Sequence, residues 1–426
     1  MTDPYDDTLL ERRRRLLGAS YRLFYDEPFH PVRGDGVWLF DRHGAPHLDA
    51  YNNVACVGHC HPRVVEAIAR QAATLNTHTR YLHETILDCA ERLTESLPAP
   101  LAQMVFTCSG SEANDLALRM ARTFTGGEGL IVTEFAYHGV TQAIAEASPS
   151  LGSRVRLGDA VRTVPSPVDC GDGEAAMGQR FAAGVQAAID DLVAHGIRPA
   201  ALLLDGVFSS DGIVTDPVEF LAPAVATIRR AGGLYIADEV QAGLGRTGTM
   251  WGFARHGVTA DLVTLGKPLG NGHPVAGVVA RRDVMDHFGE VARYFNTFGG
   301  NPVACAAALA VQEVMAEEDV IDNAARVGRY LHDCLDELAR ASERLGEVRG
   351  SGLLAGVDVL DAEGRPDAAG AQTLVDGLRR RRVLISATGP HGNVLKIRPP
   401  LVFAREHVDR LSDALAASLA GWATPR

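Results

Sequence analysis

The stretch Leu234–Gln241 (LYIADEVQ) begins with an apolar run that ends at the acid Asp238. A short apolar run of this kind is typical of a strand buried in the sheet of an α/β fold. A second short strand is expected over Thr259–Leu265, just before Lys267. Because ligands of open α/β sheets bind at the carboxyl ends of the strands, Asp238 and Lys267 are expected to meet at one edge.

Lys267 lies among glycines and apolar residues in Leu265–Gly272, with no acid beside it. Apolar surroundings lower the pKa of a lysine, which frees its amine to form a Schiff base. In isolation this would be a surface lysine in a glycine-rich turn, but the strand ending in Asp238 argues for a site. Pyridoxal phosphate needs both residues: a lysine for its aldehyde, and a carboxylate on its pyridine nitrogen. The sequence therefore predicts pyridoxal 5'-phosphate as the cofactor.

Strands and helices alternate between residues 104 and 280, which predicts a doubly wound α/β domain with a mostly parallel sheet. We expect residues 61–315 to form this large cofactor-binding domain. Residues 1–60 and 316–426 are expected to build a small α+β domain. Residues 148–178 show little pattern and are expected to be a surface excursion.

The chain has 426 residues and a net charge of −12, which argues against nucleic acid as its main partner. No apolar run approaches the roughly 18–20 residues of a membrane helix. The basic run Arg12–Arg15 is interpreted as the solvated face of an N-terminal helix rather than a localisation signal. The acidic, polar start of the chain is unlike a signal peptide.

Seven cysteines occur without a Cys-x-x-Cys pair, which favours reduced thiols in a cytoplasmic protein. Cys56, His59, Cys60 and His61 offer the ligand types of a zinc site, but no second cluster with such spacing exists. We therefore expect no metal site.

The segment Ser109–Asn114 (SGSEAN) separates an expected strand, Met104–Cys108, from an expected helix. A strand, a turn of small residues and a helix start present free N–H groups to an anion. Gly110 would let a phosphate approach closely. The same residues also fit an ordinary N-capped helix.

Tyr137 follows the next expected strand. Its side chain could stack on a flat ring, or it could simply pack against the protein.

Six motifs occur in a fixed order between roughly residues 36 and 401: Gly58–Pro62, Ser109–Asn114, Tyr137–Gly139, Asp238–Gly248, Gly266–Lys267 and Asn296–Pro302. In these motifs the chain resembles the class III (omega-type) aminotransferases of the fold-type I pyridoxal phosphate enzymes. The resemblance implies the fold-type I architecture: an α/β large domain, and a small domain built from both chain ends.

The resemblance also implies a role for each matching residue. Lys267 forms the Schiff base and moves the proton between the substrate Cα and the cofactor C4′, Asp238 pairs with the pyridine nitrogen, and Tyr137 stacks on the ring. Thr297 reaches the phosphate from a neighbouring subunit, which implies a homodimer with shared sites. The implied cofactor-binding residues are Ser109, Gly110, Ser111, Tyr137, His138, Asp238, Val240, Gln241, Lys267 and Thr297.

The substrate side departs from the family pattern. Lys396 stands where many members have a carboxylate-binding arginine, and Arg398 follows two residues later. In a strand the two would share a face, so both could line one pocket; a salt bridge at a domain edge is an equal alternative for Arg398. Ser210 replaces the glutamate that masks the arginine in members using 2-oxoglutarate. Asn53 is either a third substrate residue or a turn residue.

We expect an aminotransferase that acts on a small amine or amino acid and a keto acid. The segments Tyr51–Ala55 and Gly270–Ala276 also resemble a branch that contains phospholyases for O-phosphoethanolamine-like amines. Phosphate elimination is therefore the alternative function. A catalytically silent scaffold is disfavoured because the lysine, the ring acid and the phosphate loop are all present.

Overall fold

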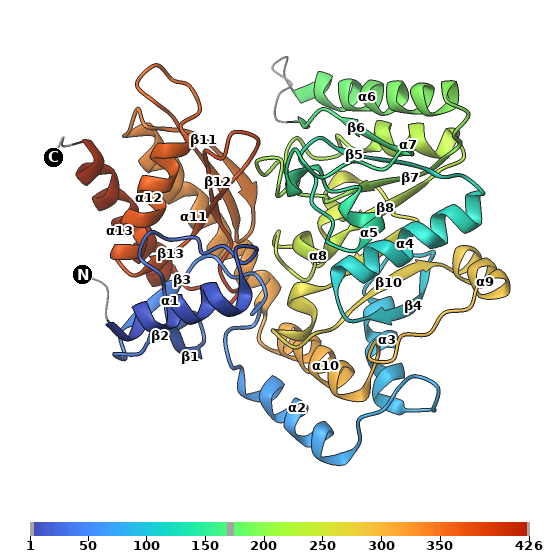
Figure 1. Ribbon diagram of the computed structural model, residues 1–426, viewed down its shortest axis with the longest axis horizontal. Helices are drawn as coiled ribbons and strands as arrows, with labels where there is room; N and C mark the ends of the chain where they lie inside the picture. The colour runs from blue at the N-terminus through green and yellow to red at the C-terminus, as the bar shows by residue number, and fades with distance from the viewer. Residues whose placement is uncertain (1–3, 168–173, 424–426) are drawn as a thin grey trace.

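The computed structural model describes residues 4–167 and 174–423, and these contain three β-sheets. A seven-stranded sheet with its helices lies on the right of Figure 1, and two four-stranded sheets lie on the left. The two ends of the chain are both on the left.

The seven-stranded sheet has the order β4-β10-β9-β8-β7-β5-β6. Only β10 runs against its neighbours, so the predicted mostly parallel sheet is confirmed. Its strands are β4 (Leu101–Thr107), β5 (Gly129–Thr133), β6 (Val161–Val164), β7 (Pro199–Leu204), β8 (Leu234–Asp238), β9 (Leu262–Leu265) and β10 (Ala276–Arg281).

Helices cover both faces of this sheet, as in a doubly wound fold (Figure 1). Alternate residues of β7 point to opposite sides: Ala201 and Leu203 join a cluster with α4 (Gly110–Thr125) and α9 (Arg282–Val291). Leu202 and Leu204 join the cluster that contains α6 (Glu174–Ala194) and α7 (Ala222–Arg230). Because β7 is buried on both faces, it is apolar throughout. Further helices are α2 (Pro62–Thr74), α3 (Glu84–Glu95), α5 (Gln142–Ala145), α8 (Glu239–Ala242) and α10 (Pro302–Glu317).

The two smaller sheets have the orders β1-β2-β3-β13 and β11-β12-β15-β14. In the first, β3 pairs in parallel with β13, so an N-terminal and a C-terminal segment share one sheet. The domain boundaries at residues 60 and 315 stay a prediction. The strands are β1 (Pro31–Asp35), β2 (Trp38–Asp41), β3 (Pro46–Asp49), β11 (Leu345–Ser351), β12 (Leu354–Val359), β13 (Val383–Leu384), β14 (Ser386–Thr388) and β15 (Val394–Ile397). The helices are α11 (Val320–Arg340), α12 (Ala368–Arg380) and α13 (Arg405–Ala423).

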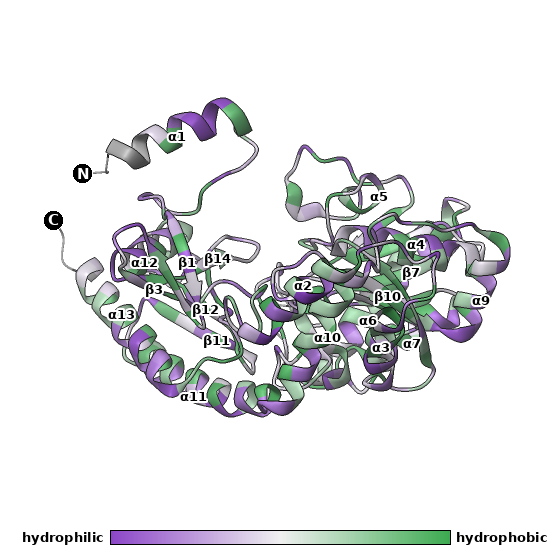
Figure 2. Cartoon of the chain, turned by 90° about the horizontal axis from the view of Figure 1, so that it is seen from below, coloured by the Kyte–Doolittle hydropathy of each residue, from purple (hydrophilic) through white to green (hydrophobic). Residues whose placement is uncertain are grey.

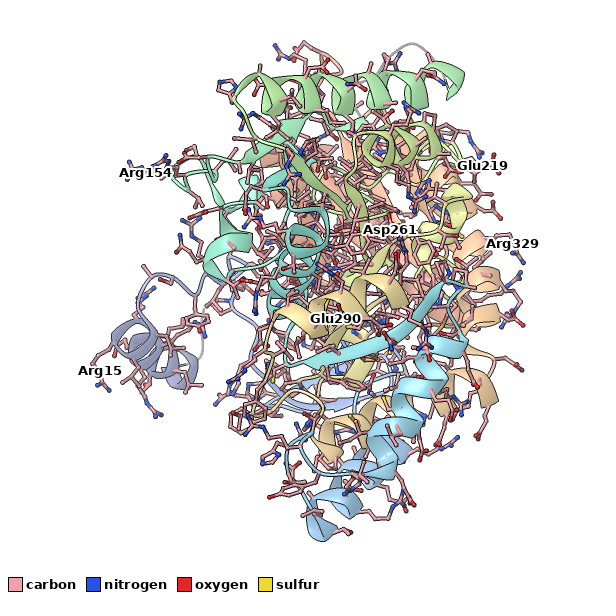
Figure 3. The ribbon with its side chains drawn as sticks, turned by 90° about the vertical axis from the view of Figure 1, so that its right-hand side faces the viewer. Arg15, Arg154, Glu219, Asp261, Glu290 and Arg329 are labelled. Carbon is pink, nitrogen blue, oxygen red and sulfur yellow. The ribbon has the colours of Figure 1, made fainter. Side chains whose placement is uncertain are left out.

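The N-terminal helix α1 (Pro4–Leu17) stands away from the sheets, and Figure 2 shows its hydrophilic stretch in purple. Arg12, Arg14 and Arg15 are exposed, which confirms the predicted solvated helix face. Figure 3 shows Arg15 projecting outwards and Asp261 in the interior. Asp261 accepts hydrogen bonds from Arg281, Arg229 and the backbone N–H of Tyr235, and so ties β8, β10 and α7 together.

Residues 148–178 differ from expectation, because they are not only a surface excursion. They include β6, which pairs in parallel with β5 at the sheet edge, and the first residues of α6, which begins at Glu174. Residues 168–173 of this range lie outside the described residues. With four residues, β6 is too short to show a strand pattern, and its two central residues, Arg162 and Thr163, are polar. Within the described ranges, no helix is long and apolar enough to cross a membrane. The same residues contain no group of three potential metal ligands among His, Cys, Asp and Glu.

Candidate active site

A cavity of about 180 Å³ lies where β4, β5, β7, β8 and β9 end. These strands run in one direction, so the residues that follow them meet at one edge of the sheet. The cavity is lined by Gly110, Ser111, Tyr137, His138, Gly139, Asp205, Asp238, Val240, Gln241 and Lys267. Eight of these ten residues were predicted from the sequence; Gly139 and Asp205 were not given a role.

Asp238 ends β8 and is 4% exposed. Its Oδ2 accepts hydrogen bonds from Asn114 Nδ2 at 2.9 Å and from His138 Nδ1 at 2.7 Å, and its Oδ1 accepts from the N–H of Val240 at 3.1 Å. Burial alone would raise the pKa of Asp238. The hydrogen bond and charge of His138, with smaller contributions from Lys267 and Asn114, outweigh burial and lower that pKa. Asp238 is therefore a buried, ionised carboxylate facing the cavity.

Asn114 supports the candidate site, although the sequence analysis quoted it without giving it a role. It lies on α4, is 1% exposed, and donates to both Asp238 Oδ2 and the backbone oxygen of His138. Thr264 donates to its Oδ1 at 2.7 Å, which fixes the orientation of the amide. The sequence did contain one signal for this role, because Asn114 is a polar residue on the apolar face of α4.

Lys267 follows β9 and opens the short 3-10 helix η4 (Lys267–Gly270). Its φ of +32° lies in the left-handed region, which costs an L-residue about 1–2 kcal/mol. Burial lowers its pKa; Asp238 opposes this shift and Arg398 reinforces it. Within the described residues its amine forms no hydrogen bond. The backbone thus holds an amine that gives up its proton more readily than an ordinary lysine does.

The start of α4 lines the same cavity through Gly110 and Ser111. Ser109 is the N-cap: its Oγ accepts from the N–H of Glu112 at 3.3 Å. The capping alternative is therefore correct for the Ser109 side chain. A Cβ at Gly110 would lie 2.9 Å from Val240 Cγ2, so only glycine fits this approach. The helix start leaves N–H groups for an anion, and phosphate binding by Ser109, Gly110 and Ser111 stays a prediction.

These features fit pyridoxal phosphate. Asp238 suits a pyridinium nitrogen, the amine of Lys267 suits an aldehyde, and the start of α4 suits a phosphate. Tyr137, which is 39% exposed, and Val240, which is 7% exposed, line the same cavity, where each could contact a ring.

The predicted substrate residues lie next to the cavity, connected through Gln241. Gln241 Oε1 accepts hydrogen bonds from Arg398 Nη1 and from Asn53 Nδ2, and its Nε2 donates to Ser209 Oγ. Arg398 Nε also donates to the backbone oxygen of Tyr51 at 3.0 Å, and its guanidinium lies over the Tyr51 ring. In the described part of the chain Arg398 has no ion pair, so the salt-bridge alternative does not hold there.

Lys396 does not line the cavity; it contacts Ser209, the hydrogen-bond partner of Gln241. Its Nζ donates to the backbone oxygen of Ser209 at 2.6 Å, and the residue is 6% exposed. Burial, reinforced by Arg398, lowers the pKa of Lys396 well below its usual value, while Asp205 opposes the shift. Lys396 and Arg398 therefore flank the same Ser209–Gln241 contact.

Thr297 is exposed and lines a separate cavity of about 160 Å³ with Asn76, Thr77, His78, Phe298 and Asn301. It does not line the Lys267 cavity of its own chain. Its predicted contact with a cofactor held by a neighbouring subunit stays a prediction.

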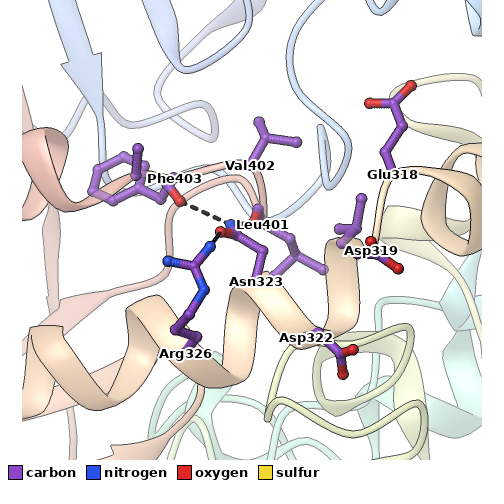
Figure 4. Close-up of a pocket in the computed structure, with 10 residues that line it drawn as sticks. Glu318, Asp319, Asp322, Asn323, Arg326, Leu401, Val402 and Phe403 are labelled. Carbon is purple, nitrogen blue, oxygen red and sulfur yellow. Dashed lines mark hydrogen bonds between the residues drawn. The ribbon is translucent and has the colours of Figure 1, made fainter.

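A larger cavity of about 600 Å³ lies between the start of α11 and residues 401–404 (Figure 4). Its polar lining includes Glu318, Asp319, Asp322 and Asn323, whose Nδ2 donates to the backbone oxygens of Leu401 and Phe403. The residues that can carry out chemistry on an amine lie in the smaller cavity, so size does not identify the active site here.

Comparisons with known proteins agree with this geometry. The family described as "Aminotransferase class-III" matches residues 25–419. "Alanine--glyoxylate aminotransferase 2-like" of Drosophila melanogaster is 40% identical, over 94% of this chain and 84% of that protein. "Ethanolamine-phosphate phospho-lyase homolog 1" of Caenorhabditis elegans is 37% identical, over 94% of this chain and 91% of that protein.

Among solved structures, a phospholyase from Arthrobacter in complex with phosphoethanolamine has a TM-score of 0.94 and 43% identity. The match covers 98% of this chain and 100% of that one. A thermostable omega-transaminase from Thermomicrobium roseum has a TM-score of 0.88 and 27% identity, with 100% of both chains covered. The strand-edge lysine, the buried acid and these matches lead to one conclusion: the chain belongs to the class III aminotransferase family of fold-type I, pyridoxal phosphate-dependent enzymes.

Proposed function

We propose that this protein is an aminotransferase that moves an amino group between a small amine or amino acid and a keto acid. The observation that carries the proposal is the pairing of Lys267 with Asp238 in one cavity: a buried amine with a lowered pKa and a carboxylate that stays ionised. This pair is what amino-group chemistry on pyridoxal phosphate requires.

Each residue has a role that its position supports. Bound pyridoxal phosphate supplies the electron sink for the pair left at the substrate Cα. Lys267 would hold the aldehyde and, once released, accept and return the Cα proton. Asp238, held by His138 and Asn114, would keep the positive charge at the ring nitrogen. Tyr137 and Val240 would orient the ring, and the start of α4 would hold the phosphate.

The substrate is proposed to carry an anionic group besides its amine. The hydrogen-bond acceptors of Arg398 and Lys396 are the neutral oxygens of Tyr51, Gln241 and Ser209. A guanidinium with only neutral partners retains its attraction for a carboxylate or a phosphate. Ser210 brings no negative charge to the place where a glutamate masks the arginine in other members.

A second candidate is phosphate elimination from a phosphorylated amino alcohol. The 43% identity to the Arthrobacter phospholyase and the Arg398 guanidinium, whose hydrogen-bond partners are neutral, favour it. Up to removal of the Cα proton, the residues of the site would act in elimination as they do in transamination. The Cβ–O bond would then break, and its electron pair would leave with the phosphate.

One panel experiment tests both candidates. The purified holoenzyme is given amines, amino acids and phosphoethanolamine, with and without a keto acid, and both new amino acid and inorganic phosphate are measured. Amine consumption that depends on the keto acid supports transamination. Phosphate release without a keto acid would instead support elimination. If the panel gave neither new amino acid nor phosphate, both candidates would be overturned.

We further propose a homodimer in which Thr297 serves the partner's site. Its exposure, away from the Lys267 cavity of its own chain, supports this, as do two exposed aromatic residues: Phe298, which lines the same cavity as Thr297, and Tyr81, which stacks on His78 of that cavity. Mixing refolded Lys267→Ala and Thr297→Ala variants tests it, since a hybrid dimer would contain one intact site. Activity above that of either variant is expected, and a monomer by light scattering would contradict the proposal.

We also propose that the protein works in the cytoplasm, where its cysteines, free throughout the described residues, would stay reduced. Cell fractionation tests this, and recovery in a secreted fraction would contradict it.

A further inference from the structure

Asp205 is a charged residue of the cavity to which the proposed mechanism gives no role. It follows β7 and lines the cavity beside Gln241 and Lys267. Its own turn fixes its position: Oδ1 accepts from the N–H of Val207 at 3.2 Å, and Oδ2 accepts from the N–H of Ser209 at 3.0 Å. The hydroxyl of Ser209 donates to the same Oδ2.

A chain of hydrogen bonds runs from Asp205 through Ser209 and Gln241 to Arg398. The chemistry of its two ends sets the direction of every bond. An ionised carboxylate only accepts, so the single hydroxyl proton of Ser209 must point to Asp205. Ser209 Oγ can then only accept from Gln241, which must offer its NH₂ group. The opposite end of the amide, Oε1, therefore faces Arg398, which can only donate.

We propose that Asp205 is the positioning residue that fixes this amide orientation, and so keeps the Arg398 guanidinium beside the cavity for the anionic end of a substrate. If the amide turned over, its NH₂ group would face the guanidinium, and Arg398 would lose this acceptor. Asn53, which donates to the same Oε1, would lose its acceptor as well. This inference rests on the proposed function only for the identity of the substrate.

A simple charge effect makes the opposite prediction, which gives the proposal a sharp test. Asp205 is a negative charge near Arg398 and Lys396. If it acted only through that charge, Asp205→Asn would strengthen the binding of an anion. If it sets the amide orientation, the same variant weakens anion binding, because an asparagine can itself donate to Ser209.

The experiment measures anion binding by the holoenzyme in three variants. Asp205→Asn changes the end of the chain, and Ser209→Ala removes the link while keeping the charge of Asp205. Thr388→Val is the matched control, because Thr388 contacts Ser209 only through the backbone oxygen, at 3.1 Å. Calorimetry gives the dissociation constant of propanoate, an anion without an amine to react. Kinetics give the KM ratio of 3-aminopropanoate to propylamine.

We expect propanoate binding to weaken about 3- to 10-fold in Asp205→Asn and Ser209→Ala, the range for one lost hydrogen bond, and the KM ratio to rise alike. Thr388→Val should keep both values. Tighter or unchanged propanoate binding in Asp205→Asn overturns the proposal, as does an equal loss for propylamine. If the wild type turned over no amine, the proposed function would fail, while propanoate binding would still test Asp205.

Discussion

The two ends of the active site hold their charged groups differently. At the cofactor end, Asp238 already accepts hydrogen bonds from His138 and Asn114 before any ligand arrives. At the substrate end, Arg398 and Lys396 contact only neutral oxygens. Hydrogen bonds fix Asp238 in place for a group that stays bound, whereas the Arg398 guanidinium, whose bonded partners are neutral, keeps its attraction for an anion that comes and goes. Substitutions at the cofactor end are thus expected to abolish the chemistry, and substitutions at the substrate end are expected to change substrate selectivity.

Lys267→Ala should have the largest effect. Without this amine no group is placed to take the Cα proton, and turnover should fall about 10⁴-fold, the upper range for one acid–base group. The steady-state rate with the best amine of the panel measures this. A variant that kept more than a tenth of the rate would show that another residue moves the proton.

Asp238→Asn should retain the cofactor but lower kcat about 10²–10³-fold for every substrate, the range for the loss of one electrostatic stabiliser in an active site. Cofactor content by absorbance and kcat for anionic and neutral amines measure this. A loss restricted to anionic amines would contradict the division of the site into two ends.

Arg398→Met should raise KM for an anionic amine about 10- to 100-fold, the range for a lost charge-assisted hydrogen bond. Propylamine should be little affected, and Arg398→Lys should recover part of the loss. The measurement is KM for 3-aminopropanoate and propylamine in both variants. Equal losses for the two amines would mean that Arg398 supports the fold and not the anion.

Lys396 should give a smaller, pH-dependent effect. Because burial lowers its pKa, the amine is uncharged above that pKa and gains a positive charge as the pH falls through it. The KM ratio of 3-aminopropanoate to propylamine should therefore fall a few-fold as the pH is lowered through that pKa, since an added positive charge strengthens anion binding. Lys396→Met should have a flat ratio, and a pH-dependent ratio in that variant would assign the effect elsewhere.

The sequence predicted the fold and the cofactor end because both depend on local pattern. Buried strands such as β7 are continuous apolar runs, and Asp238 and Lys267 directly follow strands. The edge strand β6 was missed, since four residues with a polar centre resemble a loop. The roles of Asn114 and Asp205 could not be predicted either, because their partners lie far away in the chain: Asp238 is 124 residues from Asn114.

The substrate end was harder to predict from the sequence for a related reason. Lys396 lies in β15, but Arg398 lies just beyond its last residue, so the alternation of a strand no longer fixes where Arg398 points. The partners of these cations belong to three other segments, around Tyr51, Ser209 and Gln241. Such contacts follow from the packing of the two parts of the chain, which a pattern of neighbouring residues does not contain.

One helix both lines the cofactor cavity and supports the acid of that cavity. The first turn of α4 presents Gly110 and Ser111 to the cavity, and Asn114 of the same helix donates a hydrogen bond to Asp238. Four residues at 1.5 Å each separate the two, about 6 Å along the axis. The spacing between the predicted phosphate-binding residues and the partner of Asp238 is therefore set by one rigid helix, so inserting a single residue there would move one out of register with the other.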